Sequence, residues 1–182
     1  MVNRMKIIAD THTHTIVSSD AFSTLYENVQ AAKKRGMAHL CVTEHVFSVL
    51  PNAPRPEYFK CMHALPREID GVEIVRGVEA NVIGYDGALD MPRAFARNGK
   101  IVEVNEQSPV VRPGSEEICR EMLRACMKYS VPVVVGSDAH FVDKVARFDH
   151  SLAVLEELGF PQELVLNADE ERFVGLLAAK RA

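Results

Sequence analysis

Short apolar runs alternate with amphipathic segments along this chain, and this alternation limits the fold more than any other feature. Strand-like runs occupy residues 5–9, 39–43, 72–82, 101–104 and 131–135, and segments with helical periodicity lie between most of them. The last run is almost entirely valine and is too apolar for a half-exposed strand, so we expect a central parallel strand. The pattern predicts an α/β fold with a parallel sheet, which can be open or closed into a barrel.

Helix boundaries are marked by local capping signals. Thr24 and Glu27 form a capping-box pattern at the start of a helix that Gly36 is expected to end. Asn167 and Glu170 are expected to cap the last helix. Further helices are expected over residues 58–65, 115–129 and 142–158. In the second of these, Ile118, Met122 and Cys126 share the face that we expect to be buried.

Bulk composition favours an ordinary globular domain. The chain has 182 residues, of which 47% are hydrophobic, so residues 1–182 are expected to form a single domain with a full core. The net charge is -4 and basic residues are dispersed, which disfavours a nucleic-acid partner. No apolar run approaches a membrane span of about 18 residues. The four cysteines show no C-x-x-C spacing. A cytoplasmic protein with reduced cysteines, no membrane contact and no leader is therefore expected.

Metal-ligand side chains follow three of the apolar runs. His12 and His14 come after the first run, His45 after the second, and Asp138 with His140 after the valine run. Side chains at the carboxyl ends of parallel strands converge on one rim of an α/β protein. Residues two apart on a strand end also point to the same face, a spacing suited to chelating one ion. The repetition of this pattern predicts a metal site.

Two carboxylates and three other histidines need separate weighing. Glu79 stands at the end of an apolar run, where a metal would compensate its charge, although a solvent-facing position on an edge strand fits the local pattern equally well. Asp20 can be a ligand or simply part of a loop or N-cap. His39, His63 and His150 are interpreted as structural or surface residues and are not expected to bind metal.

Four motifs resemble those of the PHP family, the polymerase and histidinol phosphatase group of metal-dependent phosphoesterases. They are Asp-Thr-His-Thr-His at 10–14, Thr-Glu-His at 43–45, Arg-Gly-Val-Glu-Ala-Asn at 76–81 and Gly-Ser-Asp-Ala-His at 136–140. Residues 113–121 and 165–167 are also similar to the small bacterial YcdX-like branch. The motifs occur in the family's order and span most of the chain.

The resemblance implies a distorted TIM-like barrel of seven βα units that holds up to three Zn, Mn or Fe ions at its rim. Carried over by motif, one ion would be held by His12, His14, Glu79 and Asp138, and another by Asp20, His45 and His140. The family usually has histidine at the place of Asp20. Aspartate is an oxygen ligand and would shift the preference toward harder ions such as Mn.

This chain departs from the family between Asp90 and Ile101. Relatives carry further βα units there, with two histidines for a third ion, whereas this chain has no histidine between His63 and His140. A hairpin signal at Asp86-Gly87 leads to the next strand in about ten residues, so roughly two βα units are missing. We expect a reduced barrel of about five units with about two ions. An open side would expose sheet edges, which favours a homo-oligomer.

The expected function is metal-dependent hydrolysis of a small phosphorylated substrate, with a metal-activated water and no protein nucleophile. Arg112 is a candidate phosphate clamp, although a solvated surface arginine fits it as well. A second hypothesis is a non-catalytic metal-binding module. A third is an amidohydrolase-like enzyme acting on C–N bonds, but neither Lys60 nor Lys100, the only candidates near the rim for a bridging carbamate, follows a convincing strand.

Overall fold

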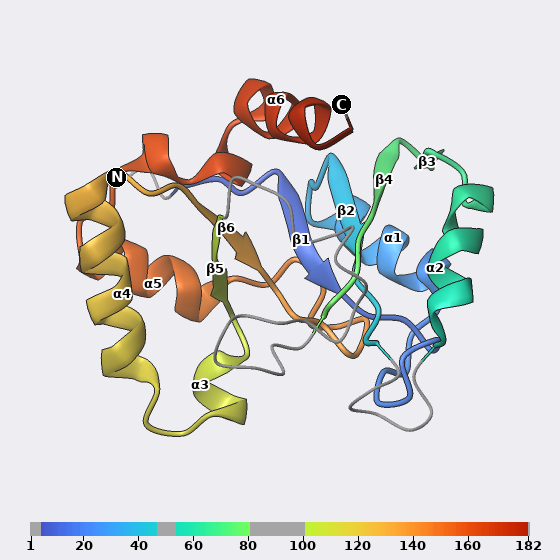
Figure 1. Cartoon of the computed structure of the whole chain (residues 1–182), viewed down its shortest axis with the longest axis horizontal. Coiled ribbons are helices and arrows are strands. Elements are labelled where there is room, and N and C mark those ends of the chain that lie inside the picture. Colours follow the sequence, from blue (N-terminus) through green and yellow to red (C-terminus); the bar gives the residue numbers. More distant parts are fainter. Residues whose placement is uncertain (1–4, 47–53, 81–100, 182) are drawn as a thin grey trace.

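The computed structural model describes residues 5–46, 54–80 and 101–181 (Figure 1). Its strands form two sheets. The larger sheet has the order β1-β2-β4-β3, and the smaller pairs β5 with β6. All pairings are parallel except that of β3 with β4. The strands are β1 (Ala9–Thr13), β2 (His39–Val42), β3 (Glu68–Ile69), β4 (Val72–Arg76), β5 (Val102–Asn105) and β6 (Val133–Gly136).

The two sheets meet where β6 lies beside β1. A parallel bridge joins Thr13 to Ala139 beyond the end of β6. Towards the other end, the buried side chain of Asn167 links the strands: its Oδ1 accepts from Val135 N at 3.0 Å, and its Nδ2 donates to Ala9 O at 2.8 Å and to Val135 O at 2.7 Å. The predicted capping role of Asn167 is therefore wrong, because its amide is fully used between the strands.

The strands consequently lie in the spatial order β5, β6, β1, β2, β4 and β3, as Figure 1 shows. This confirms the predicted α/β class. The described strands do not close into a barrel, since β3 and β5 are not paired with each other. The predicted Asp86-Gly87 hairpin lies outside the described residues.

Helices flank the strands, and the one that begins after Thr24 shows how the sequence sets its ends. Thr24 accepts from Glu27 N and Glu27 accepts from Thr24 N, so the predicted capping box is confirmed. Gly36 follows this helix with φ +77°, a conformation that favours glycine. None of the helices in the described ranges could cross a bilayer. They are α1 (Leu25–Lys34), α2 (Pro56–Cys61), α3 (Ser108–Val111), α4 (Glu116–Tyr129), α5 (Asp149–Glu157) and α6 (Glu170–Arg181).

Helix α5 begins later than predicted, at Asp149 instead of near residue 142. The preceding backbone is bound to other parts of the chain: Val142 N donates to Ser23 Oγ at 2.7 Å, and Ala146 N donates to Asp10 Oδ2 at 2.7 Å. Ala146 also has φ +55°, which a helix does not accommodate. Tertiary hydrogen bonds thus override the apolar periodicity of this segment.

The predicted buried face of α4 is wrong in part. Cys126 is buried together with Leu123, but Ile118 is 70% exposed and Met122 is 37% exposed. The first turns of α4 therefore lie beyond the core that holds its second half. Strand β1 also begins at Ala9, where the predicted strand ended, so His12 lies within β1 and not beyond it.

Candidate metal centre

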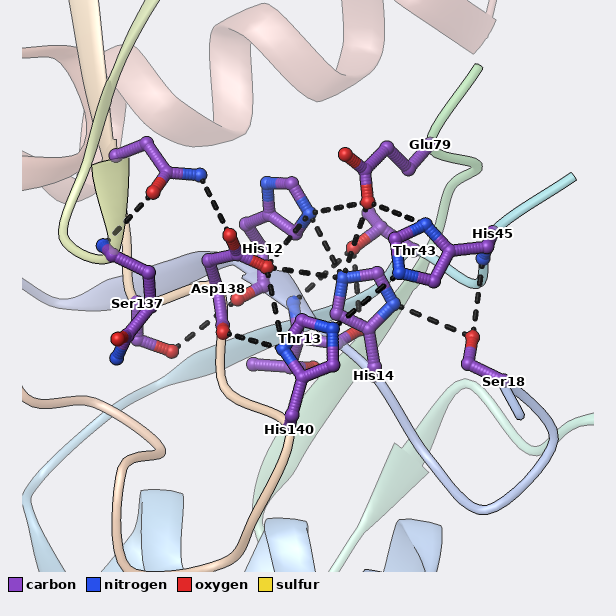
Figure 2. Close-up of polar contacts among 12 residues, drawn as sticks. His12, Thr13, His14, Ser18, Thr43, His45, Glu79, Ser137, Asp138 and His140 are labelled. Atoms are coloured by element: carbon purple, nitrogen blue, oxygen red, sulfur yellow. Dashed lines mark hydrogen bonds and ion pairs between the residues drawn. The ribbon is translucent and has the colours of Figure 1, made fainter. Parts of the chain in front are cut away.

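Six of the seven predicted ligands converge at the carboxyl ends of four parallel strands (Figure 2). His12 lies in β1 and His14 just after it, while His45 follows β2. Glu79 follows β4, and a parallel bridge between His45 and Glu79 extends the β2–β4 pairing to the site. Asp138 and His140 follow β6 in the same way. Sheet topology therefore brings together residues that are more than a hundred positions apart in the chain.

The first group comprises His12, His14, Glu79 and Asp138, whose ligand atoms all lie within 4.8 Å of one another. The two Nε2 atoms of His12 and His14 are 3.0 Å apart. Glu79 Oε2 lies 3.2 Å from His12 Nε2, and Asp138 Oδ1 lies 3.2 Å from His14 Nε2. Two imidazoles and two carboxylates that face one point form a donor set suited to a divalent transition ion.

The second group comprises His14, His45 and His140, again with ligand atoms within 4.8 Å. His45 Nε2 lies 3.4 Å from His140 Nε2. Asp20 Oδ2 approaches these two nitrogens at 3.3 and 3.5 Å, so the structure brings Asp20 to the group as the sequence suggested. Glu79 Oε2 is 2.9 Å from His45 Nδ1. Glu79 and His14 thus contact both groups.

The electrostatics of the cluster favour positive charge between its carboxylates. Burial opposes ionisation of Glu79, but hydrogen bonds from His12, His14 and His45 outweigh it and hold the pKa of Glu79 well below its usual range. Burial likewise acts against Asp138, yet the contact with His14 lowers its pKa to about 2. Burial would lower the pKa of His12, but the carboxylates hold it well above the ordinary value.

Two buried carboxylate oxygens support a metal ion as a partner of this donor set. Asp20 Oδ1 is buried and accepts no hydrogen bond from the described residues. Asp138 Oδ1 is also buried, and the donors near it are ring nitrogens of the cluster, with His14 Nε2 at 3.2 Å. Buried carboxylate oxygens without a donor are costly, and a divalent ion is a partner that would satisfy them. Asp138 also has φ +51°, a strained backbone conformation for a non-glycine residue. Asn105 Nδ2 supports its other oxygen at 3.1 Å.

The sequence analysis missed Glu103, which supports His12 from β5. Glu103 Oε1 lies 2.8 Å from His12 Nδ1, so the opposite nitrogen of the ring is directed at the cluster. Gly136 permits this approach, because a Cβ there would lie 2.7 Å from His12 Cβ and would collide with Glu103 Oε1. A charged residue within the apolar run 101–104 is the signal that could have revealed it.

Glu44 is a second residue that the sequence analysis missed. It is fully buried and accepts from Thr15 N at 3.1 Å, Thr15 Oγ1 at 2.6 Å and Ser18 Oγ at 2.6 Å. Because the Ser18 proton is directed to Glu44, Ser18 Oγ is free to accept from His45 N at 3.1 Å and faces His14 Nδ1 at 3.4 Å. Glu44 therefore fixes the loop that positions both histidines.

The other residues weighed in the sequence lie away from these groups. His39 bridges Glu73 and Glu170 at 2.8 Å each, which ties the start of β2 to α6. His63 is exposed and contacts Lys60 O. Arg112 is exposed after α3 and donates to Ser108 Oγ at 3.3 Å, and within the described ranges its side chain makes no hydrogen bond or ion pair to the clustered residues.

The fold and this cluster define an α/β protein with adjoining histidine–carboxylate groups at one end of parallel strands, an arrangement typical of enzymes that hold divalent ions. The chain belongs to the PHP domain family, whose sequence profile matches residues 10–177. The family assignment made from the four motifs is thereby confirmed.

Several curated proteins are similar over nearly their whole length. A probable phosphatase of Acetivibrio thermocellus is 32% identical over 236 residues, covering 97% of this chain and 98% of that protein. Probable phosphatases of Caldanaerobacter subterraneus subsp. tengcongensis and Clostridium botulinum are 30% and 31% identical, with 94% and 96% of their lengths covered. These alignments are longer than the 182-residue chain, so the relatives contain internal segments without a counterpart here. This agrees with the shortening predicted from the sequence.

Proposed function

We propose that this protein is a metal-dependent phosphoesterase that hydrolyses phosphate monoesters. The observation that carries the proposal is the pair of adjoining groups, with His14 and Glu79 in contact with both. Membership of the PHP domain family and the names of the relatives support the same reaction class.

Two ions per chain suit the donor set. One would be held by His12, His14, Glu79 and Asp138, and the other by Asp20, His45 and His140, with Zn, Mn or Fe as the candidates. A third ion would need further histidines, and the sequence has none between His63 and His140.

The chemistry that bound divalent ions supply at such a site is polarisation of the phosphoryl group and acidification of a water molecule. In the net reaction the water oxygen bonds to phosphorus and the ester P–O bond breaks. One proton goes to the departing alcohol, and inorganic phosphate is released. The chain's own side chains position the reacting groups: Glu103 and Ser18 orient His12, His14 and His45, and the Glu79 carboxylate stays ionised because its pKa is depressed.

Elemental analysis and one activity screen test this proposal. The purified protein should contain about two ions per chain and should hydrolyse a chromogenic phosphate ester but no chromogenic amide. His14→Gln should lose both metal and turnover, whereas His63→Gln, which changes an exposed histidine outside the groups, should retain both. Bound metal without turnover would instead support the non-catalytic module, and amide hydrolysis would support the C–N hydrolase.

We also propose that residues 1–182 form one reduced, open barrel that assembles into a homo-oligomer in the cytoplasm. Ile118 and Tyr129 on α4 are 70% and 69% exposed, which supports contact with a second copy. The four cysteines are unpaired, in keeping with a reducing compartment. Light scattering that gives the mass of a monomer would contradict the oligomer.

A further inference from the structure

A cavity of about 570 Å³ opens directly beside the metal-ligand cluster. Asp20, Asp138 and His140 form part of its wall. These residues lie where the cluster faces solvent, since side-chain exposure rises from 0% at His14 to 32% at His140 and 42% at Asp20. The volume is in the range of small-molecule sites. A molecule that reaches the cluster from this side therefore occupies this cavity.

The rest of the wall consists of two apolar residues, one lysine, one glutamine and one aspartate. Phe141 and Val111 line it and are 51% and 61% exposed, so both present apolar surface to whatever fills the cavity. Lys144 also lines it, and its amine forms no ion pair within the described ranges. Gln107 and Asp143 complete the wall. The cavity thus offers an aromatic face and a cation next to a cluster suited to phosphate chemistry.

The segment that carries Phe141 and Lys144 is held in place at both ends. Ser23 Oγ accepts from Val142 N at 2.7 Å, and the buried Asp10 accepts from Ala146 N at 2.7 Å. Within the segment, Lys144 N donates to Phe141 O at 2.9 Å and closes a turn. A fixed backbone lowers the entropic cost of contacts that these side chains make with a ligand.

We propose that this cavity binds the alcohol portion of a phosphate monoester and selects an aromatic one. Phe141 and Val111 contact the ring, and Lys144 pairs with an oxygen of the phosphate. This inference rests on the proposed function and adds a substrate class: aryl or similarly flat, apolar phosphate esters in preference to small polar ones.

Binding of two phosphonates, which resist hydrolysis, tests the apolar part by isothermal titration calorimetry. Protein reconstituted with Mn²⁺ should bind phenylphosphonate about tenfold more tightly than methylphosphonate. Phe141→Ala should abolish this preference. Phe22→Ala is the matched control, because Phe22 is 73% exposed and does not line the cavity, and it should leave the preference unchanged.

Lysine variants test the charged part. Lys144→Ala should weaken the binding of both phosphonates about equally, by roughly tenfold, as expected for the loss of a charge-assisted hydrogen bond. Lys144→Arg keeps the positive charge and should bind both phosphonates as the wild type does. Lys33→Ala changes an exposed lysine on α1 and should have no effect. Equal binding of the two phosphonates, no binding of either, or insensitivity to the Phe141 and Lys144 variants would overturn the inference.

Turnover measured in parallel separates this inference from the proposed function. A preference for phenylphosphonate that depends on Phe141, without hydrolysis of any phosphate ester, would refute the enzyme but support the binding cavity. Hydrolysis of phosphate esters without an aromatic preference would refute the cavity's role and leave the enzyme proposal standing.

Discussion

Replacing Glu103 with glutamine should weaken metal binding, although Glu103 belongs to neither ligand group. Its Oε1 holds His12 Nδ1 at 2.8 Å, which directs Nε2 toward His14 and Glu79. Glutamine keeps the shape but removes the charge. Loss of such a supporting carboxylate costs 10- to 100-fold in metal affinity, about 1.4–2.7 kcal/mol. Calorimetric titration of chelator-treated protein with Mn²⁺ or Zn²⁺ measures the change.

The pH dependence of the same variant gives a sharper test. Burial would lower the pKa of His12, but Glu103 and Glu79 raise it well above the ordinary value, so metal must displace a proton that is held below this pKa. The wild-type affinity should therefore rise with pH until this pKa is passed. Without the Glu103 charge the pKa of His12 falls. The metal affinity of the variant should therefore stop rising at a lower pH than that of the wild type, and its maximum should be lower.

The difference in metal affinity between the wild type and Glu103→Gln should consequently be smallest at acidic pH and largest at alkaline pH. Glu121→Gln, an exposed change on α4, controls for loss of a surface charge and should match the wild type at every pH. Equal affinities of Glu103→Gln and wild type across the pH range, or a deficit that grows toward acid, would refute the supporting role of Glu103.

Three further substitutions test the frame of the site. Gly136→Ala should destabilise the fold by about 1–3 kcal/mol in urea and reduce metal content, because the added Cβ would lie 2.7 Å from His12 Cβ; a neutral result would contradict this packing. Asn167→Ala should lower the free energy of unfolding by about 1–3 kcal/mol, because Val135 N loses its acceptor. The control Gln162→Ala, at an exposed position, should change it by no more than about 0.5 kcal/mol. Ser18→Ala should lower metal affinity about tenfold and the free energy of unfolding by about 1–3 kcal/mol, because the buried Glu44 loses a donor and His45 N loses an acceptor. Unchanged metal affinity would count against the support that Ser18 gives to His45.

The residues that could be predicted from the sequence are those with a local signal. His12 and His14 share a two-residue spacing at a strand end, and Asp138 and His140 repeat it after the valine run, so strand topology alone was enough to bring them together. Thr24 with Glu27 is equally local, and its capping box was predicted correctly.

Residues whose role depends on distant partners could not be placed in this way. Asparagine is a common helix-capping residue, but the side-chain amide of Asn167 bonds to the backbone of Ala9 and Val135, each more than thirty positions away in the chain. The segment 142–148 has helical periodicity, yet two of its amides, those of Val142 and Ala146, donate to the side chains of Ser23 and Asp10. Such competition for backbone hydrogen bonds is decided by tertiary structure and leaves no trace in a local pattern.

The order of the strands explains how a shortened chain can keep this cluster. The ligands of both groups follow β6, β1, β2 and β4, which are neighbours in space, and Asp20 lies in the loop between β1 and α1. The shortening expected from the sequence falls between β4 and β5. In space, β5 is at one end of the row of strands, and β4 is at the other end except for the short β3 beside it. Removing units there leaves every contact among the two groups in place and keeps Glu103 on β5 within reach of His12, because β5 is held by β6. A cluster of candidate ligands built from neighbouring strands can thus persist when units are lost elsewhere in the chain, because no contact within the cluster depends on those units.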